Sequence, residues 1–361
     1  MHLKIGIIHI QSGIFPLASY DFADAVVAGL EKEGFTVEII VQDAEGGTNA
    51  KLISEKALKL FRADKVATIF TLAENNSIVE ALEALVVWIK KPVFIASFGA
   101  RLGTPPTPSG YLYFVELDAW KSAWAAGREM STQYARVAQL SALYEAGYQF
   151  AYAFFKGVAA KEGSLSPAIY VIKEPKVASE IEKMFTQIAE GKPEAFYLTM
   201  SFKESAAVLS AYSQSEWANT PLFITPFALN EYTDIQSLAN IPNLYELSAI
   251  NEEKMQREPL EGMETTHFSL LGYEAGRIFG RKHQQTSPED ITIDSPRGEI
   301  TLLKDTFHVV ANQYLYKISV ENGNIKKTLV KTITDLPDLA GLFAGETQVQ
   351  FSQWANPYLF A

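Results

Sequence analysis

Apolar and polar positions along the first third of the chain predict strands that alternate with amphipathic helices. Ile5 to Ile10 is an apolar, β-branched run of the kind found in strands buried on both faces. A helix is expected over 21–33, where Phe22, Val26 and Leu30 share one face and Gly34 follows. The alternation continues to the strand ending at residue 97, which predicts a parallel sheet with right-handed crossovers.

A second series of alternating elements begins after the proline-rich loop 103–110 and a short strand over 111–117. Its expected helices, with strands between them, cover 120–135, 148–160, 177–190 and 204–212. A further helix is expected over 269–283, and a hairpin near 314–330 takes its turn from Asn322-Gly323. The chain therefore contains two α/β units.

Three sequence blocks of the first unit recur in the second in the same order, which indicates an internal duplication. FTLAENNSIVEAL (70–82) resembles FYLTMSFKESAAVL (196–209), PVFIASFGA (92–100) resembles PLFITPFAL (221–229), and YLYFVELDA (111–119) resembles NLYELSAIN (243–251). The first pair contains Ser77-x-x-Glu80 and Ser201-x-x-Glu204, each of which predicts a helix capping box. The repeat makes Phe98 and Phe227 equivalent.

Composition and motifs exclude several classes of function. The 361 residues carry a net charge of −11 without a basic block, which disfavours nucleic acid and anionic lipid as partners. The chain has no Cys, and no apolar run reaches the ~20 residues of a membrane span. GxGxxG, GxxxxGK[ST], HExxH and GxSxG motifs are absent, and the five His residues are scattered, so no metal, cofactor or enzymatic activity is predicted. His9 is interpreted as structural and Asp43 as a turn residue.

The order of several segments resembles that of type I periplasmic solute-binding proteins, closest to the branched-chain amino acid receptors of ABC transporters. The resemblance covers about residues 3–330 and is carried by KIGIIHIQSG, VEIIVQDAEG, TLAENNS, PVFIASFGA, YLYFVELDAWKSAW, LYEAGYQFAYAFFKGV and, most specifically, SPRGEITLLKDTFHVV. It implies two Rossmann-like, doubly wound lobes joined by three crossings, near Asp118, near Ala249, and between His283 and Ile291. The expected lobes are 1–118 with 250–288 and 119–249 with 289–333, and the tail 334–361 has no assigned place.

The resemblance also implies a function. Such a protein is exported, closes on a small molecule in the cleft between its lobes, and delivers it to an ABC permease. The segment MHLKIGIIHI is interpreted as a strand and not as a signal peptide, so the chain is either cytosolic or begins where a mature exported protein would begin. Two alternatives remain: a ligand-sensing receptor or regulatory subunit that acts through a sensor partner, and an enzyme with two Rossmann-like lobes. The missing glycine fingerprint argues against the enzyme.

The candidate ligand-binding residues lie where strands are expected to end. In the family, polar groups after the third and fourth strands hold the ligand carboxylate, and these map onto Asn75, Asn76, Ser77, Ser97 and Gly99. Candidates of the second lobe are Tyr144, Glu145, Tyr148, Phe202, Thr225 and Phe227; Phe15 and Phe98 complete the aromatic set of the first lobe. Many aromatic rings favour an apolar or aromatic ligand. Glu145 and Glu231 are the candidates for an ammonium-binding acid, and neither matches the family position, which disfavours an α-amino acid.

Overall fold

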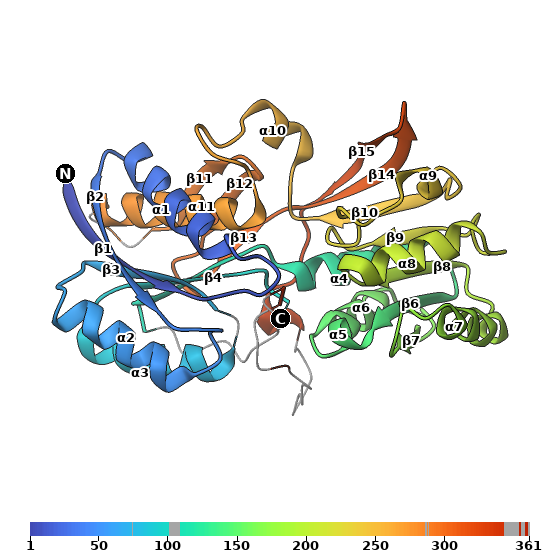
Figure 1. The fold of residues 1–361 in the computed structure, drawn as a ribbon, viewed down its shortest axis with the longest axis horizontal. Helices are drawn as coiled ribbons and strands as arrows, with labels where there is room; N and C mark the ends of the chain where they lie inside the picture. Colours follow the sequence, from blue (N-terminus) through green and yellow to red (C-terminus); the bar gives the residue numbers. More distant parts are fainter. Residues whose placement is uncertain are drawn as a thin grey trace. The chain divides into compact units, whose positions relative to one another are not determined.

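The chain folds into two compact units, each built from non-contiguous segments. The computed structural model describes residues 1–73, 75–100, 109–285, 287, 289–342, 354 and 358–359. Of these, unit 1 comprises 1–117, 250–311 and the tail residues 354, 358 and 359, and unit 2 comprises 118–249 and 312–342 (Figure 1).

Unit 1 is a doubly wound α/β domain. Its parallel sheet has the order β2-β1-β3-β4-β5, with β1 His2–His9, β2 Thr36–Asp43, β3 Thr68–Leu72, β4 Val93–Ser97 and β5 Leu112–Glu116. Figure 1 shows one pair of helices on each face of this sheet: α1 (Ala18–Lys32) with α11 (His267–Gln284), and α2 (Ala50–Arg62) with α3 (Asn76–Ile89). A short helix and a small antiparallel sheet complete the unit: α10 (Glu252–Arg257), β11 (Ile291–Ser295), β12 (Gly298–Leu302) and β13 (Val309–Ala311).

Unit 2 has a seven-stranded sheet of order β15-β14-β10-β9-β8-β6-β7. The parallel strands are β6 Val137–Ala142, β7 Ala168–Ile172, β8 Ala195–Thr199, β9 Leu222–Ile224 and β10 Leu244–Ser248. Two antiparallel strands extend the sheet, β14 Gln313–Glu321 and β15 Asn324–Ile333. The helices are α4 Ala119–Gln133, α5 Leu143–Ala146, α6 Phe150–Ala159, α7 Ala178–Gly191, α8 Phe202–Ser213, α9 Ile235–Leu238 and α12 Leu339–Leu342.

The two units share one topology. The order β2-β1-β3-β4-β5 in unit 1 has the same connectivity as β7-β6-β8-β9-β10 in unit 2. Phe98 directly follows β4, and Phe227 lies three residues after β9, the strand that occupies the same place in its sheet. The structure therefore contains the duplication that the three recurring sequence blocks predict.

Each unit also contains a pair of helices whose backbones touch through glycine. A Cβ atom on Gly276 of α11 would lie 2.3 Å from the carbonyl oxygen of Val26 in α1, and one on Gly157 of α6 would lie 2.0 Å from that of Trp124 in α4. Real Cβ atoms do not approach a carbonyl so closely, so only glycine permits these distances. The same restriction applies to three further positions, Gly29, Gly272 and Gly127.

The third crossing between the two units lies later in the chain than the sequence analysis expected. Residues 289–311, expected in the second lobe, lie in unit 1, because β11–β13 form their own sheet beside β5 and the chain enters unit 2 only at Asn312. The other two changes of unit follow Leu117 and Ala249. The predicted hairpin turn is confirmed: Asn322 and Gly323 both have positive φ, 52° and 77°, between the paired residues of β14 and β15.

Both predicted capping boxes are wrong. The cap of α3 is Asn75, whose side chain accepts a hydrogen bond from the backbone N–H of Ser77. Ser201 occupies the cap position of α8, but its side chain makes no capping hydrogen bond. Burial raises the pKa of Glu204, the expected partner of Ser201. The first motif fails because α3 begins at Asn76, so Ser77 lies inside the first turn, and the second fails because the hydroxyl of Ser201 bonds to Glu145.

We expect Gly157→Ala to destabilise the protein by about 1–3 kcal/mol, since the added methyl group must push α6 away from α4. The gain in helix propensity, about 1 kcal/mol, does not offset this loss of packing. Urea unfolding followed by circular dichroism measures the effect. Gly46→Ala is the matched control, because nothing lies within 4 Å of its added Cβ. Equal stability of the two variants would contradict the glycine contact.

Candidate functional site

The carboxyl ends of the parallel strands carry most of the candidate residues. In open α/β sheets, ligands bind beyond these ends, where loops connect strands to helices. Each unit presents its own set of such loops.

The aromatic residues of unit 1 form a cluster at this edge. Phe15, in the loop between β1 and α1, and Phe98, directly after β4, each lie edge-on to Phe268, with ring centroids 5.3 Å apart in both pairs. The ring of His267 lies 6.0 Å from that of Phe98. These rings form a surface that we call the aromatic wall, which consists of Phe15, Phe98, His267 and Phe268. The structure thus brings two predicted residues together through a third, Phe268, that the sequence analysis missed.

The N-terminus of α11 holds Phe268 in place. Thr266 caps the helix: its hydroxyl accepts a hydrogen bond from the N–H of Ser269, and the Ser269 hydroxyl accepts one from the N–H of Thr266. This reciprocal cap fixes the first turn, which carries His267 and Phe268. The pair Thr266–Ser269 before an apolar run is a start signal for a helix, so the sequence contained the information that places these rings at a helix end.

A residue of the C-terminal tail joins the wall. The ring of Tyr358 lies edge-on to that of Phe98, with centroids 6.3 Å apart, and Tyr358 has no exposed surface. The tail 334–361 was expected without an assigned place; of its described residues, 334–342 belong to unit 2, whereas 354, 358 and 359 belong to unit 1.

Polar groups at the start of α3 form a second feature of unit 1. The Oδ1 atom of Asn75 accepts hydrogen bonds from the backbone N–H and the hydroxyl of Ser77, at 2.9 and 2.7 Å. Asn75 and Asn76 are half-buried, whereas Ser77 is exposed. The positive end of the helix dipole here favours an anion, and the amide groups can donate to one.

Ser97 and Gly99, the other candidates for holding a carboxylate, are engaged with each other and with Glu116. The hydroxyl of Ser97 donates to Oε1 of Glu116 at 3.0 Å and accepts from the N–H of Gly99 at 3.1 Å. Ser97 has a single proton to donate. It can therefore donate to a ligand carboxylate only after its bond to Glu116 breaks.

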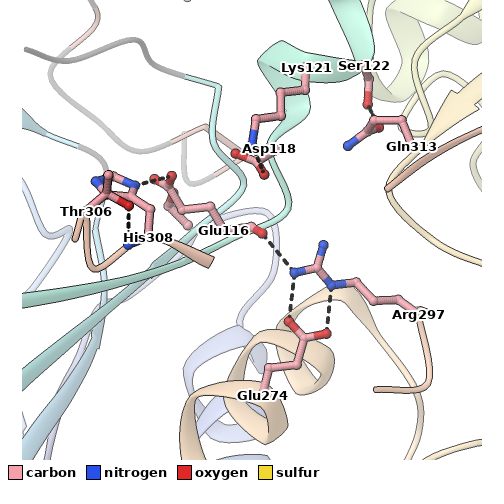
Figure 2. A network of polar contacts seen from close by, with 10 residues as sticks. Glu116, Asp118, Lys121, Ser122, Glu274, Arg297, Thr306, His308 and Gln313 are labelled. Atoms are coloured by element: carbon pink, nitrogen blue, oxygen red, sulfur yellow. Dashed lines mark hydrogen bonds and ion pairs between the residues drawn. The ribbon is translucent and has the colours of Figure 1, made fainter. Parts of the chain in front are cut away.

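Glu116 is the central residue of a larger polar network in unit 1 (Figure 2). Its Oε2 lies 3.4 Å from Nδ1 of His308, whose ring stacks on Phe114 with centroids 4.3 Å apart. Its carbonyl oxygen accepts a hydrogen bond from Nη2 of Arg297 at 3.0 Å. Arg297 also forms a bidentate pair with Glu274, at 2.7 and 2.9 Å, and both side chains have 0% exposure.

This network joins segments that lie far apart in the sequence. The carbonyl oxygen of Arg297 accepts from the N–H of Asn251, the second residue after the chain returns to unit 1, and Glu116 is the second-last residue before the chain first leaves it. Arg297 belongs to the segment SPRGEI, which carried the family resemblance but no assigned role. Glu274 was missed, although a carboxylate between Leu271 and Ala275 on a buried helix face indicates a buried partner.

In unit 2, two loops are joined by a buried carboxylate. The hydroxyl of Ser201, after β8, donates to Oε1 of Glu145 at 2.6 Å, and only 1% of Glu145 is exposed. This bond replaces the capping bond expected of Ser201. Next to Glu145, the hydroxyls of Tyr148 and Tyr144 lie 3.3 Å apart in a weak hydrogen bond. Glu231, the other candidate acid, is exposed.

Asn230 connects the remaining candidates of unit 2. Its side-chain amide lies 3.1 Å from the carbonyl oxygen of Phe202 and 3.4 Å from that of Phe227, so it ties the loops after β8 and β9 together. Phe202 has a φ of 54°, a left-handed conformation that costs free energy in a bulky residue. Thr225 is 2% exposed, and its hydroxyl has no hydrogen-bond partner among the described residues. Asn230 was not predicted.

Asp43 and His9, two polar residues near the end of β1 and β2, make local contacts. Asp43 accepts hydrogen bonds from the N–H of Glu45 and from the amide of Gln11, both at 2.8 Å, and the first of these is the main reason why its pKa is lowered. His9 packs edge-on against Tyr20.

Within the described part of the chain, no group of His, Asp and Glu side chains is arranged to hold a metal ion. Likewise, none of the helices described has both the length and the apolar character needed to cross a bilayer.

Comparison with known proteins adds a family and a fold. The family described as "Periplasmic binding protein" matches residues 2–324. No curated protein matches the chain. Among solved structures, a solute-binding protein of an R. palustris ABC transporter in complex with 4-hydroxybenzoate is similar, with 18% identity over 94% of this chain and 98% of that one and a TM-score of 0.68.

Two further structures show the same fold. The ABC transporter substrate-binding protein of Sphaerobacter thermophilus has 18% identity over 94% of this chain and 100% of that one, with a TM-score of 0.72. A branched-chain amino acid transporter substrate-binding protein of Streptococcus pneumoniae, in complex with isoleucine, has 12% identity over 93% and 100%, with a TM-score of 0.62. At these identities the similarity establishes the fold of this chain, which is the two-unit α/β fold expected from the sequence.

We expect Arg297→Met to destabilise unit 1 by about 3–5 kcal/mol, because it leaves the carboxylate of Glu274 buried without its cation. Adding Glu274→Leu should recover more than half of the loss, since the second charge is then removed as well. Urea unfolding measures both effects. Lys4→Met is the matched control, because the pair Lys4–Glu38 is 35% and 46% exposed, so solvent screens it and its loss should cost far less. A similar small loss for Arg297→Met would contradict the role of the pair.

Proposed function

Because the chain belongs to the periplasmic binding protein family, we propose that it is the extracytoplasmic solute-binding component of an ABC transporter and that its ligand is a small aromatic carboxylate. The main support for an aromatic ligand is the aromatic wall, in which Phe15 and Phe98 both pack against Phe268 at the carboxyl edge of the unit 1 sheet. The complex of the similar R. palustris protein with 4-hydroxybenzoate supports the same class.

An aromatic acid needs two kinds of surface, and the strand-end residues supply both. Its ring is stabilised by edge-to-face contacts with other rings, which contribute about 0.5–1.5 kcal/mol per pair beyond the burial of area. Its carboxylate is stabilised by the N-terminus of α3, where Asn75 and Asn76 add amide groups. A ligand hydroxyl is the natural partner for the hydroxyl of Thr225, which is buried and has no partner among the described residues.

The same residues disfavour an α-amino acid, the ligand class of the branched-chain subfamily. An ammonium group needs an acid that can face it. Glu231 is exposed, and Glu145 already accepts a hydrogen bond from Ser201 and is 1% exposed. The isoleucine complex of the Streptococcus pneumoniae protein makes an aliphatic amino acid the competing ligand class.

The proposed action is reversible binding without catalysis. A ligand that interacts more strongly with one conformation of a protein shifts the population towards it, and the permease then recognises the loaded form. No covalent step is needed for this role.

Isothermal titration of the full chain with 4-hydroxybenzoate, benzoate and isoleucine tests the proposal. We expect the two aromatic acids to bind with micromolar or tighter affinity and isoleucine to bind at least about a hundredfold more weakly, a difference of about 2.7 kcal/mol. Tight binding of isoleucine with no binding of either aromatic acid would overturn the ligand class. It would leave the solute-binding role in place.

We expect Thr225→Val to weaken the binding of 4-hydroxybenzoate about tenfold, because the isosteric side chain removes one hydrogen bond to the ligand. The protein itself should be as stable as before or more stable, since a buried hydroxyl without a partner is lost. Thr68→Val is the matched control: the hydroxyl of Thr68 donates to the carbonyl oxygen of Pro92, just before β4 begins and away from the strand carboxyl ends. Its affinity should stay unchanged. An unchanged affinity of Thr225→Val would show that this hydroxyl does not contact the ligand.

A further inference from the structure

Helices α2 and α3 lie side by side on one face of the unit 1 sheet and end at the same edge (Figure 1). Each connects two parallel strands, so both run against the strands and finish at the amino edge, opposite the candidate ligand-binding residues. The guanidinium carbon of Arg62, the last residue of α2, lies 4.1 Å from the centre of the Trp88 ring in the last turn of α3. The two helix ends therefore form one continuous surface.

Four cations gather at these helix ends, and we call them the basic patch: Arg62, Lys65, Lys90 and Lys91. Arg62, Lys65 and Lys90 are exposed. The half-buried ammonium of Lys91 donates a hydrogen bond to the carbonyl oxygen of Val66 at 2.7 Å. Burial, and then the charge of Lys65, lower the pKa of Lys91. The like charges of the patch thus lie close enough to act on one another.

No acid neutralises the basic patch within the part of the chain that the structure describes, where none of its four residues forms an ion pair. Asp64, the acid between Arg62 and Lys65 in the sequence, has one carboxylate oxygen buried. Other exposed lysines do have acids beside them, as Lys183 has Glu180 at 4.0 Å. The patch therefore keeps a local excess of positive charge, although the whole chain carries −11.

Two apolar side chains lie beside the basic patch. Val87 and Trp88 are consecutive residues of the last turn of α3 and are 56% and 60% exposed. A single exposed apolar residue is ordinary. The negative end of a helix dipole explains lysines at a helix C-terminus, but it does not explain an exposed tryptophan among them. Cations around an exposed tryptophan suit a membrane–water interface, where this residue type is enriched.

The composition of the patch favours a bilayer over a protein partner. Three of its four cations are lysines, which are depleted in protein interfaces, whereas arginine is enriched there. A second copy of the chain fits poorly as well. A two-fold contact would place the basic patch against itself, and a head-to-tail contact with an acidic face would not close into a defined oligomer.

We propose that the basic patch, together with Val87 and Trp88, is a site of peripheral attachment to a bilayer that contains anionic lipid. The cations bind the phosphates of the head groups, and the two apolar side chains enter the interface. The net charge of −11 opposes this attraction. At physiological ionic strength, however, salt screens charges more than about 8 Å apart, so the local excess decides. The sequence analysis disfavoured anionic lipid because it considered the charge of the whole chain.

The site goes beyond the proposed function and does not depend on the ligand. A protein held on the bilayer remains close to a permease embedded in the same membrane. Its tests contain no ligand, so their failure leaves the solute-binding role in place.

Sedimentation of the full chain with lipid vesicles tests the attachment. We expect binding to phosphatidylcholine vesicles that contain about 30% phosphatidylglycerol, and at least about tenfold weaker binding to vesicles of phosphatidylcholine alone. Binding to the anionic vesicles should fall as salt is added, because salt screens the head-group charge. No binding to the anionic vesicles would overturn the proposal.

A charge variant tests the assignment to the basic patch. The patch variant carries Arg62→Gln, Lys65→Gln and Lys90→Gln, and we expect it to bind the anionic vesicles at least about tenfold more weakly. The matched control removes the same charge from exposed lysines that have acids beside them: Lys51→Gln, Lys183→Gln and Lys326→Gln. Its binding should stay within about twofold of the parent. Equal binding by the two variants would overturn the assignment, because net charge alone would then decide.

The apolar part of the site is tested with Trp88→Ala. We expect about three- to tenfold weaker binding to the anionic vesicles, since the ring no longer enters the interface. In the parent, vesicles should shift the tryptophan emission to shorter wavelength, and Trp88→Ala should lose this shift. Tyr232→Ala is the matched control and should bind like the parent, because Tyr232 is also an exposed ring, 47%, with a lysine, Lys203, 4.9 Å from its centre. Unchanged emission of the parent with bound vesicles would overturn the insertion of Trp88.

Sedimentation velocity without vesicles distinguishes a bilayer from a second copy. We expect the parent and the patch variant both to sediment as the same species. Self-association of the parent that the patch variant loses would assign the basic patch to a second copy of the chain, and it would overturn the proposal.

Discussion

The carboxyl edge of unit 1 depends on the ion pair between Glu274 and Arg297. Both side chains have 0% exposure, so each charge is stabilised in the interior only by the other and by the hydrogen bonds around them. Arg297 uses its remaining groups to hold the backbone of Glu116 and of Asn251. The pair therefore fixes the end of β5 and the start of the segment that returns to unit 1 at Ile250. Through Glu116 it also positions Ser97 and Gly99.

The duplication explains how one chain presents two similar sets of strand-end loops. The sheets share one strand order, and in each unit a helix that follows a change of unit, α11 or α4, packs on a helix of that unit through glycine. Unit 1 also contains the β11–β13 sheet with Arg297 and His308, whereas unit 2 contains β14 and β15. The loops at the strand ends also differ: unit 1 has the aromatic wall, and unit 2 has the buried pair of Glu145 and Ser201.

Periodicity predicted the main strands and helices of both units, because apolar spacing reports directly which face is buried, but it missed the short helices α5, α9, α10 and α12 and the sheet β11–β13. It could not predict the third change of unit, since the local pattern of residues 289–311 does not say which unit the segment joins. Local motifs succeeded where one conformation was required, as at Asn322-Gly323, and failed at Ser77, because the helix begins earlier, at Asn76, and Asn75 caps it. Phe15 and Phe98 could be found as strand-end rings, but Phe268 and Tyr358 lie far from them in sequence, and only tertiary packing brings them together.

Native mass spectrometry of the full-length protein, purified without unfolding, tests the central claim most directly, because it detects the molecule that the protein itself selects. The account predicts a bound species with the mass of a small aromatic carboxylate, released by mild collisional activation and less abundant in preparations of Thr225→Val. A zwitterionic aliphatic amino acid as the bound species would contradict the aromatic ligand. A nicotinamide dinucleotide that is turned over would contradict the binding role itself.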